Sequence, residues 1–84
     1  MGDGDLGRAR RALRATLYTR DGCPHCARLR DELLASGDRV TEVNLSREPQ
    51  AMAEFLKISG GRRIVPVVVR AGRIEVAPGG GTSF

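Results

Sequence analysis

Hydrophobic residues recur along this chain with two different periods, which predict where strands and helices lie. In the first such segment Leu17 and Tyr18 fall on opposite sides, as in a strand. A run of β-branched residues and a turn at Ala71-Gly72 indicate a closing hairpin. Four segments have the pattern of strands: 15–19, 39–45, 65–69 and 73–76.

Two segments have helical spacing. The first helix is predicted to begin with Pro24 at its first position, where the missing N–H costs nothing, and to end near Gly37. Its apolar stripe is Cys26, Leu29, Leu33 and Leu34. The second helix is predicted over residues 47–58, with Ser46 as N-cap and Gly60-Gly61 as its end. Its buried stripe is Met52, Phe55, Leu56 and Ile58.

The element order is strand, helix, strand, helix, strand, strand, which predicts a small α/β fold. The first two strands form a right-handed parallel unit, and the hairpin extends the same sheet to four mixed strands. Residues 1–13 lack periodicity and are predicted to be a flexible segment before a domain over residues 14–84. The expected core consists of Leu17, Leu29, Leu33, Phe55, Leu56 and residues 67–69.

Composition narrows the functional classes. The 84 residues suffice for one small domain, and two cysteines exclude a multi-bridged secreted scaffold. No apolar run approaches the roughly 20 residues of a membrane span, and the start lacks the apolar segment of a signal peptide. The net charge is +4, but no aromatic residue interleaves the basic stretch 8–14. We therefore expect a cytoplasmic protein that binds neither membrane nor nucleic acid.

The cysteines Cys23 and Cys26 stand at the start of the first predicted helix. Such a pair can be half of a zinc site, a structural pair or a reversible dithiol. An intrachain zinc site needs four ligands and is disfavoured, although two copies together would supply four sulfurs. The helix N-terminus favours a Cys23 thiolate, whereas Cys26, one turn deeper on the apolar stripe, is expected to be less exposed. This favours a redox pair of nucleophile and resolving cysteine, with Pro24 stiffening the turn and no metal.

Two other residues have both a structural and a functional interpretation. His25 is either a solvated residue of the first turn or a donor that stabilises the thiolate and makes the disulfide more oxidising. Pro66 is either an ordinary proline at a strand start or a cis proline facing Cys23. A cis Val65–Pro66 bond would turn the backbone groups of Val65 outward, free to pair with a peptide-like substrate.

The whole pattern resembles the glutaredoxin family. The resemblance rests on residues 19–26 (Thr-Arg-Asp-Gly-Cys-Pro-His-Cys), on residues 61–66 (Gly-Arg-Arg-Ile-Val-Pro) and on a downstream Gly-Gly. It implies a three-layer thioredoxin-like fold whose usual C-terminal helix is missing from this sequence. The hairpin end and the Gly-Gly-Thr tail are also similar to a group of short bacterial glutaredoxin-like proteins. His25 and Ile64 replace the Tyr and Thr usual in the family.

The resemblance also implies roles for individual residues. Cys23 would attack a glutathione mixed disulfide or a protein disulfide, and Cys26 would resolve the second. Pro66 would be the cis proline, and Val65 would pair through its backbone with glutathione, the expected co-substrate. Arg20 and Arg63 match positions that bind glutathione carboxylates, which an arginine fork suits, although both could be solvated surface charges. The glutathione site would be completed by Gly80, Gly81 and Thr82.

The sequence thus predicts a monomeric thiol–disulfide oxidoreductase acting on protein disulfides or glutathione mixed disulfides. One alternative keeps the chemistry but recharges the protein from a thioredoxin reductase, making it an electron donor coupled to that enzyme. A different class of function is a carrier that holds an iron–sulfur cluster between two subunits through Cys23 and glutathione. A brown dimer after anaerobic purification would favour the carrier, and a colourless monomer would exclude it.

Overall fold

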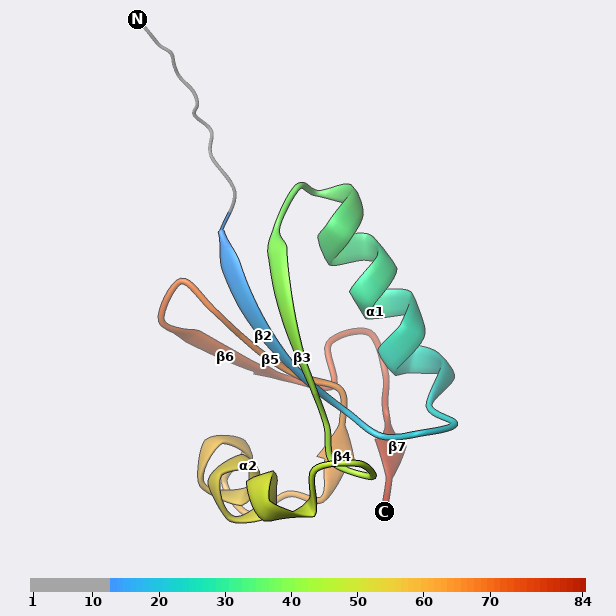
Figure 1. Ribbon diagram of the computed structural model, residues 1–84, viewed down its shortest axis with the longest axis vertical. Coiled ribbons are helices and arrows are strands. Elements are labelled where there is room, and N and C mark those ends of the chain that lie inside the picture. The colour runs from blue at the N-terminus through green and yellow to red at the C-terminus, as the bar shows by residue number, and fades with distance from the viewer. Residues whose placement is uncertain (1–12) are drawn as a thin grey trace, which may run out of the picture.

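The computed structural model describes residues 13–84, so the prediction of a flexible segment over residues 1–13 falls almost wholly outside the described residues. The elements run along the chain in the predicted order, with additional short segments (Figure 1). They are β2 (Arg14–Thr19), α1 (Pro24–Ala35), β3 (Arg39–Asn44), η1 (Pro49–Ala51), α2 (Met52–Ser59), β4 (Ile64–Val65), β5 (Val67–Arg70), β6 (Arg73–Val76) and β7 (Thr82–Ser83).

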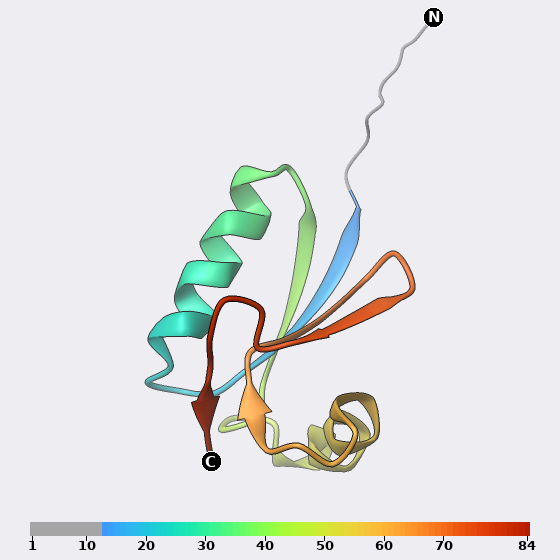
Figure 2. The same cartoon turned by 180° about the vertical axis from the view of Figure 1, so that it is seen from behind.

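The central sheet has the four mixed strands that the sequence predicts, and their spatial order is β3-β2-β5-β6. β2 pairs with β3 in parallel and with β5 antiparallel, and β5 pairs antiparallel with β6. The helices α1 and α2 lie on opposite sides of this sheet (Figures 1 and 2). The molecule therefore has the predicted layers of helix, sheet and helix. No helix within residues 13–84 is long and apolar enough to cross a membrane.

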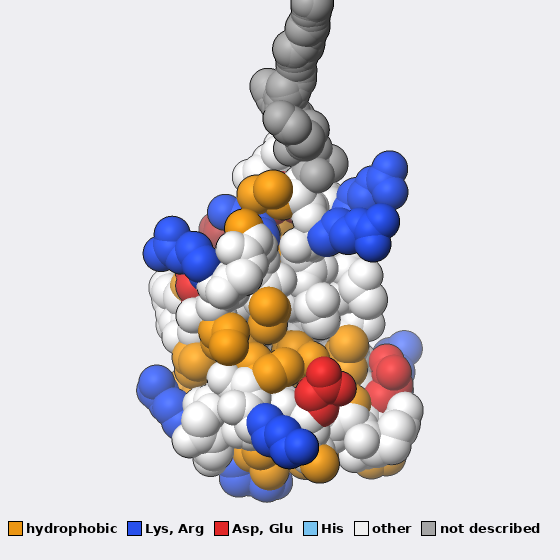
Figure 3. Space-filling view, turned by 90° about the vertical axis from the view of Figure 1, so that its left-hand side faces the viewer, with side chains coloured by type: hydrophobic (Ala, Val, Ile, Leu, Met, Phe, Trp, Pro, Cys, Tyr) orange, Lys and Arg blue, Asp and Glu red, His pale blue; other side chains and the backbone are white. Residues whose placement is uncertain are grey.

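Alternation along the strands divides the core into two clusters. On the α1 side, Leu17 and Val68 pack with Leu29 and Leu33 of the helix. On the α2 side the cluster is centred on Phe55, and its partly buried members reach the surface between α2 and the β5–β6 hairpin (Figure 3). These clusters confirm the predicted core, with Leu56 and Val69 partly rather than fully buried.

Leu34 is the exception on the first helix. The sequence pattern places it on the apolar stripe with Leu29 and Leu33, but it is 54% exposed. Leu33 already fills the contact with the sheet, and the next residue along a helix is turned by about 100° away from that direction. The Leu34 side chain therefore does not belong to the core.

The second helix begins later than predicted, and Ser46 does not cap it. Pro49 opens the short 3₁₀ turn η1, and α2 follows from Met52. The residue before a proline avoids the helical conformation, and Glu48 has φ −127° and ψ 67°, so regular helix cannot start at residue 47. The Ser46 hydroxyl instead accepts the backbone N–H of Asp21 at 3.1 Å, which joins its loop to the one before the cysteines.

The predicted strand over residues 65–69 is interrupted at Pro66. The Val65–Pro66 peptide bond is cis, and Pro66 has no N–H to offer the sheet. Pro66 therefore separates β4 from β5. A second, two-stranded sheet forms where β4 pairs antiparallel with β7 near the end of the described chain. The sequence pattern predicts no element for residues 82–83.

Tyr18 provides a pH-dependent probe of this fold. Burial, followed by the nearby Glu54 carboxylate, raises the pKa of its phenol above the ordinary value of 10.0. In the unfolded chain the phenol ionises near its ordinary pKa, so the free energy of unfolding should fall as pH rises above 10.0. Because Tyr18 is the only tyrosine, ultraviolet titration reports it alone. We expect a higher midpoint in the native than in the denatured protein; equal midpoints would contradict the raised pKa.

Candidate redox site

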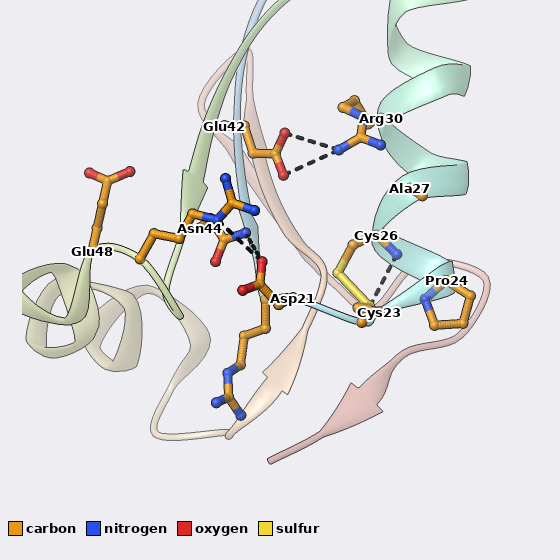
Figure 4. A pocket seen from close by; sticks show the side chains of 12 residues that line it. Asp21, Cys23, Pro24, Cys26, Ala27, Arg30, Glu42, Asn44 and Glu48 are labelled. Atoms are coloured by element: carbon orange, nitrogen blue, oxygen red, sulfur yellow. Dashed lines mark hydrogen bonds and ion pairs between the residues drawn. A yellow bond between two sulfur atoms is a disulfide. The ribbon is translucent and has the colours of Figure 1, made fainter.

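Cys23 and Cys26 form a disulfide at the start of α1 (Figure 4). Cys23 is the N-cap residue, and its sulfur accepts the backbone N–H of Cys26 at 3.1 Å. Pro24 occupies the start of the helix as predicted, and the first turn contains no acidic residue. A thiolate formed at Cys23 on reduction would therefore face a backbone donor and the positive end of the helix dipole.

Burial distinguishes the two cysteines less than the sequence predicted. Cys26 is 3% exposed and Cys23 only 7%, because both belong to the cluster on the α2 side of the sheet. The Cys23 sulfur also lies 3.9 Å from the carbonyl oxygen of Val65. Val65 is 42 residues further along the chain, so the fold brings together the two segments that sequence analysis singled out.

The backbone of Val65 is not free, in contrast to the prediction. Val65 lies opposite Thr82 in the antiparallel pairing of β4 with β7. Gly81 allows this approach, since a Cβ there would lie 2.5 Å from the Val65 carbonyl oxygen. The tail thus occupies the edge of β4 beside the disulfide.

Arg20 and Arg63 are brought together, but on an aromatic ring. Their guanidinium carbons lie 4.4 Å and 5.0 Å from the centroid of the Phe84 ring. Arg63 also donates from Nε to the backbone oxygen of Phe84 at 3.2 Å. Phe84 is not among the site residues predicted from the sequence; its only signal there is that an aromatic residue, rare in this chain, follows a run of glycines.

His25 contacts the glycine-rich tail. A Cβ at Gly80 would lie 2.9 Å from the imidazole Cε1, so only glycine fits against the ring without a shift. Among residues 13–84, the buried imidazole Nδ1 has no hydrogen-bond partner. One turn further along α1, Arg28 donates to the carbonyl oxygen of Gly79 at 3.0 Å. The tail is therefore attached to the same helix that carries the disulfide.

An open cleft of about 730 Å³ lies beside the disulfide, between α1 and β3 (Figure 4). Most of the charged side chains that line this cleft form ion pairs with one another. Arg30 donates to Glu42 at 3.1 and 3.3 Å, and Arg47 lies 3.4 Å from the Asp21 carboxylate. These four residues are not predicted from the sequence, because the partners of each ion pair come from separate elements. Within residues 13–84, no group of three or more His, Cys, Asp or Glu side chains could hold a metal ion.

Comparison with known proteins assigns the family. The glutaredoxin family model matches residues 15–74, most of the chain. The chain belongs to the glutaredoxin family. The matched span contains both cysteines and the Val65–Pro66 segment, and it ends within β6, before the tail that pairs with β4.

Individual glutaredoxins show how far the similarity extends. A glutaredoxin of Neisseria meningitidis is 33% identical over 55 residues, and a putative glutaredoxin of Mycobacterium tuberculosis is 39% identical over 54. These matches cover 64% and 63% of this chain, and the chain spans 65% and 63% of those relatives. The crystal structure of a glutaredoxin from Archaeoglobus fulgidus superimposes with a TM-score of 0.65 at 22% identity, over 93% of this chain and 89% of that one. This structural match supports the same thioredoxin-like fold.

Proposed function

We propose that this protein is a thiol–disulfide oxidoreductase that uses Cys23 as nucleophile and Cys26 as resolving cysteine. The observation that carries the proposal is the Cys23–Cys26 disulfide at the N-terminus of α1, beside the Val65 carbonyl. A thiolate at a helix N-terminus has a lowered pKa and is therefore available to attack a disulfide at neutral pH. Membership of the glutaredoxin family supports the same chemistry.

The reaction with a protein disulfide has two exchange steps. The Cys23 thiolate attacks one substrate sulfur, forming a mixed disulfide and releasing the other substrate sulfur as a thiolate, which takes up a proton. Cys26 then loses its proton and attacks the Cys23 sulfur, forming the Cys23–Cys26 disulfide and releasing the second substrate thiol. The substrate gains two electrons and two protons, and the protein loses them.

With a glutathione mixed disulfide, Cys23 acts without its partner. It attacks the glutathione sulfur and releases the substrate thiol, and a second glutathione thiolate then frees Cys23 as glutathione disulfide forms. We assign the carboxylates of glutathione to Arg20 and Arg63, which lie near one another at the edge of this site. We propose that His25, when protonated, adds positive charge beside the Cys23 thiolate.

The reductant can be identified directly. The oxidised protein is mixed with glutathione, or with a thioredoxin reductase and its NADPH, and recovered thiols are counted by alkylation and mass spectrometry. We expect glutathione to restore both thiols and the reductase to leave the disulfide largely intact, because the two arginines suit a ligand with two carboxylates. Dithiothreitol serves as a control for reducibility. Recovery with the reductase alone would identify the protein as an electron donor coupled to that enzyme.

A further inference from the structure

We propose that the tail strand Thr82–Phe84 occupies the place of the substrate's backbone and competes with glutathione for the redox site. This inference rests on the proposed function and adds a determinant of its specificity. Its basis is that one short segment contacts the backbone of Val65 and both of the arginines assigned to glutathione. A peptide substrate cannot use these groups while the tail holds them.

The pairing between β4 and β7 shows which backbone groups the tail occupies. Phe84 donates its N–H to the carbonyl oxygen of Arg63 at 3.0 Å. Hydrogen-bonded and non-bonded residue pairs alternate along an antiparallel ladder, so the next bonded pair is Val65 with Thr82. Thr82 therefore lies where a substrate cysteine would lie if its backbone paired with Val65. Ser83 sits in the intervening non-bonded pair, and its N–H points away from β4.

Phe84 holds the second half of the site. Its ring lies under the guanidinium groups of Arg20 and Arg63 and also packs against Phe55, with centroids 5.7 Å apart. The buried Arg20 Nε finds no hydrogen-bond partner in the described part of the chain, so this arginine contacts the ring without satisfying all of its donors there. A carboxylate ligand would supply an acceptor that the phenyl ring lacks. A ligand with carboxylates can therefore bind Arg20 more completely than the tail does, and can displace the tail from it.

Glutathione can bind only to molecules in which the tail has left the site. Its apparent affinity is therefore its intrinsic affinity multiplied by the fraction of molecules with an open site. A few backbone hydrogen bonds and two cation–π contacts would keep that fraction at about one tenth or below. Longer protein substrates can make additional contacts while they displace the tail. The tail therefore selects against small glutathione-containing substrates in favour of larger disulfide partners.

The test uses full-length variants of the oxidised protein. Thr82→Pro removes the N–H donated to Val65, and Phe84→Ala removes the ring beneath the arginines. Ser83→Pro is the matched control, since it introduces the same ring at the adjacent position without removing a hydrogen bond to β4. The rate of reduction of the Cys23–Cys26 disulfide is measured with glutathione and with dithiothreitol, which has neither peptide groups nor carboxylates. Circular dichroism checks that each variant is folded.

We expect Thr82→Pro to raise the glutathione rate about tenfold and Phe84→Ala about fivefold, with dithiothreitol rates and Ser83→Pro unchanged within about twofold. A lower glutathione rate in Thr82→Pro would overturn the proposal and make Thr82 a glutathione ligand, as the family resemblance implies. Unchanged rates, or equal gains with both reductants, would also overturn it. Failure of the proposed function is distinguished separately, because it would appear as wild-type protein that cannot reduce a protein disulfide.

Discussion

Replacement of Cys23 with serine is expected to abolish reduction of both protein disulfides and glutathione mixed disulfides. A serine hydroxyl is not ionised at neutral pH and cannot attack sulfur, so no mixed disulfide forms. The loss should be roughly 10³-fold or more, down to the rate of glutathione alone. The measurement is steady-state reduction of a glutathionylated peptide and of a protein disulfide, with glutathione disulfide detected through glutathione reductase.

Cys26→Ser is the matched variant, because it removes the second sulfur from the same helix turn. It should retain much of the activity on the glutathionylated peptide while losing reduction of the protein disulfide, which needs the resolving thiol. The assignment of roles would be wrong if both variants lost activity on the peptide, or if neither did. The two substrates thus separate nucleophile from resolving cysteine.

Phe55→Ala should have the largest effect on stability. The Phe55 side chain is 0% exposed, and its ring lies 5.7 Å from both the Tyr18 and the Phe84 rings. Truncation of a buried phenylalanine costs about 3–5 kcal/mol. A chain of this length has about 4–13 kcal/mol of total stability, so the variant should lose at least about a quarter of it. Chemical denaturation followed by circular dichroism measures the loss.

Leu34→Ala is the control for that truncation. Leu34 is also a large hydrophobic residue in a helix, but it is 54% exposed. Its free energy of unfolding should change by less than about 0.5 kcal/mol. Similar losses in the two variants would show that Phe55 does not hold the α2 side of the core. The comparison also tests whether Leu34, which the sequence pattern places on the apolar stripe of the first helix, contributes to the core.

Local patterns predicted most of the fold because each depends on neighbouring residues. Alternation placed Leu17 and Tyr18 on opposite faces of β2, and the structure puts them in separate clusters. Pro24 marked the start of α1, since only the first turn tolerates a residue without an N–H. The spacing of Cys23 and Cys26 likewise predicted a pair within bonding reach, which the structure contains as a disulfide.

Predictions failed where competing local signals could not be ranked. Ser46 has the right chemistry for an N-cap, but Pro49 delays the helix, and the Ser46 hydroxyl binds the backbone of a different loop. Leu34 has the right hydrophobicity for the core, but Leu33 already occupies the contact with the sheet. The partner of the Ser46 hydroxyl and the exposure of Leu34 both depend on which groups lie nearby in the folded chain.

The amino-acid sequence alone is enough to predict the order of elements, the cysteine pair at a helix N-terminus and the likeness to glutaredoxins. Those features follow from periodicity, turn residues and short motifs, which act over a few positions of the chain. The family resemblance also implied the cis Val65–Pro66 bond, which the structure contains. It takes the folded structure to show that the Val65 carbonyl lies beside the Cys23 sulfur and that Thr82 and Phe84 cover the groups predicted for glutathione. Such contacts join segments far apart in sequence, and no local pattern encodes them, because they depend on how completed elements pack.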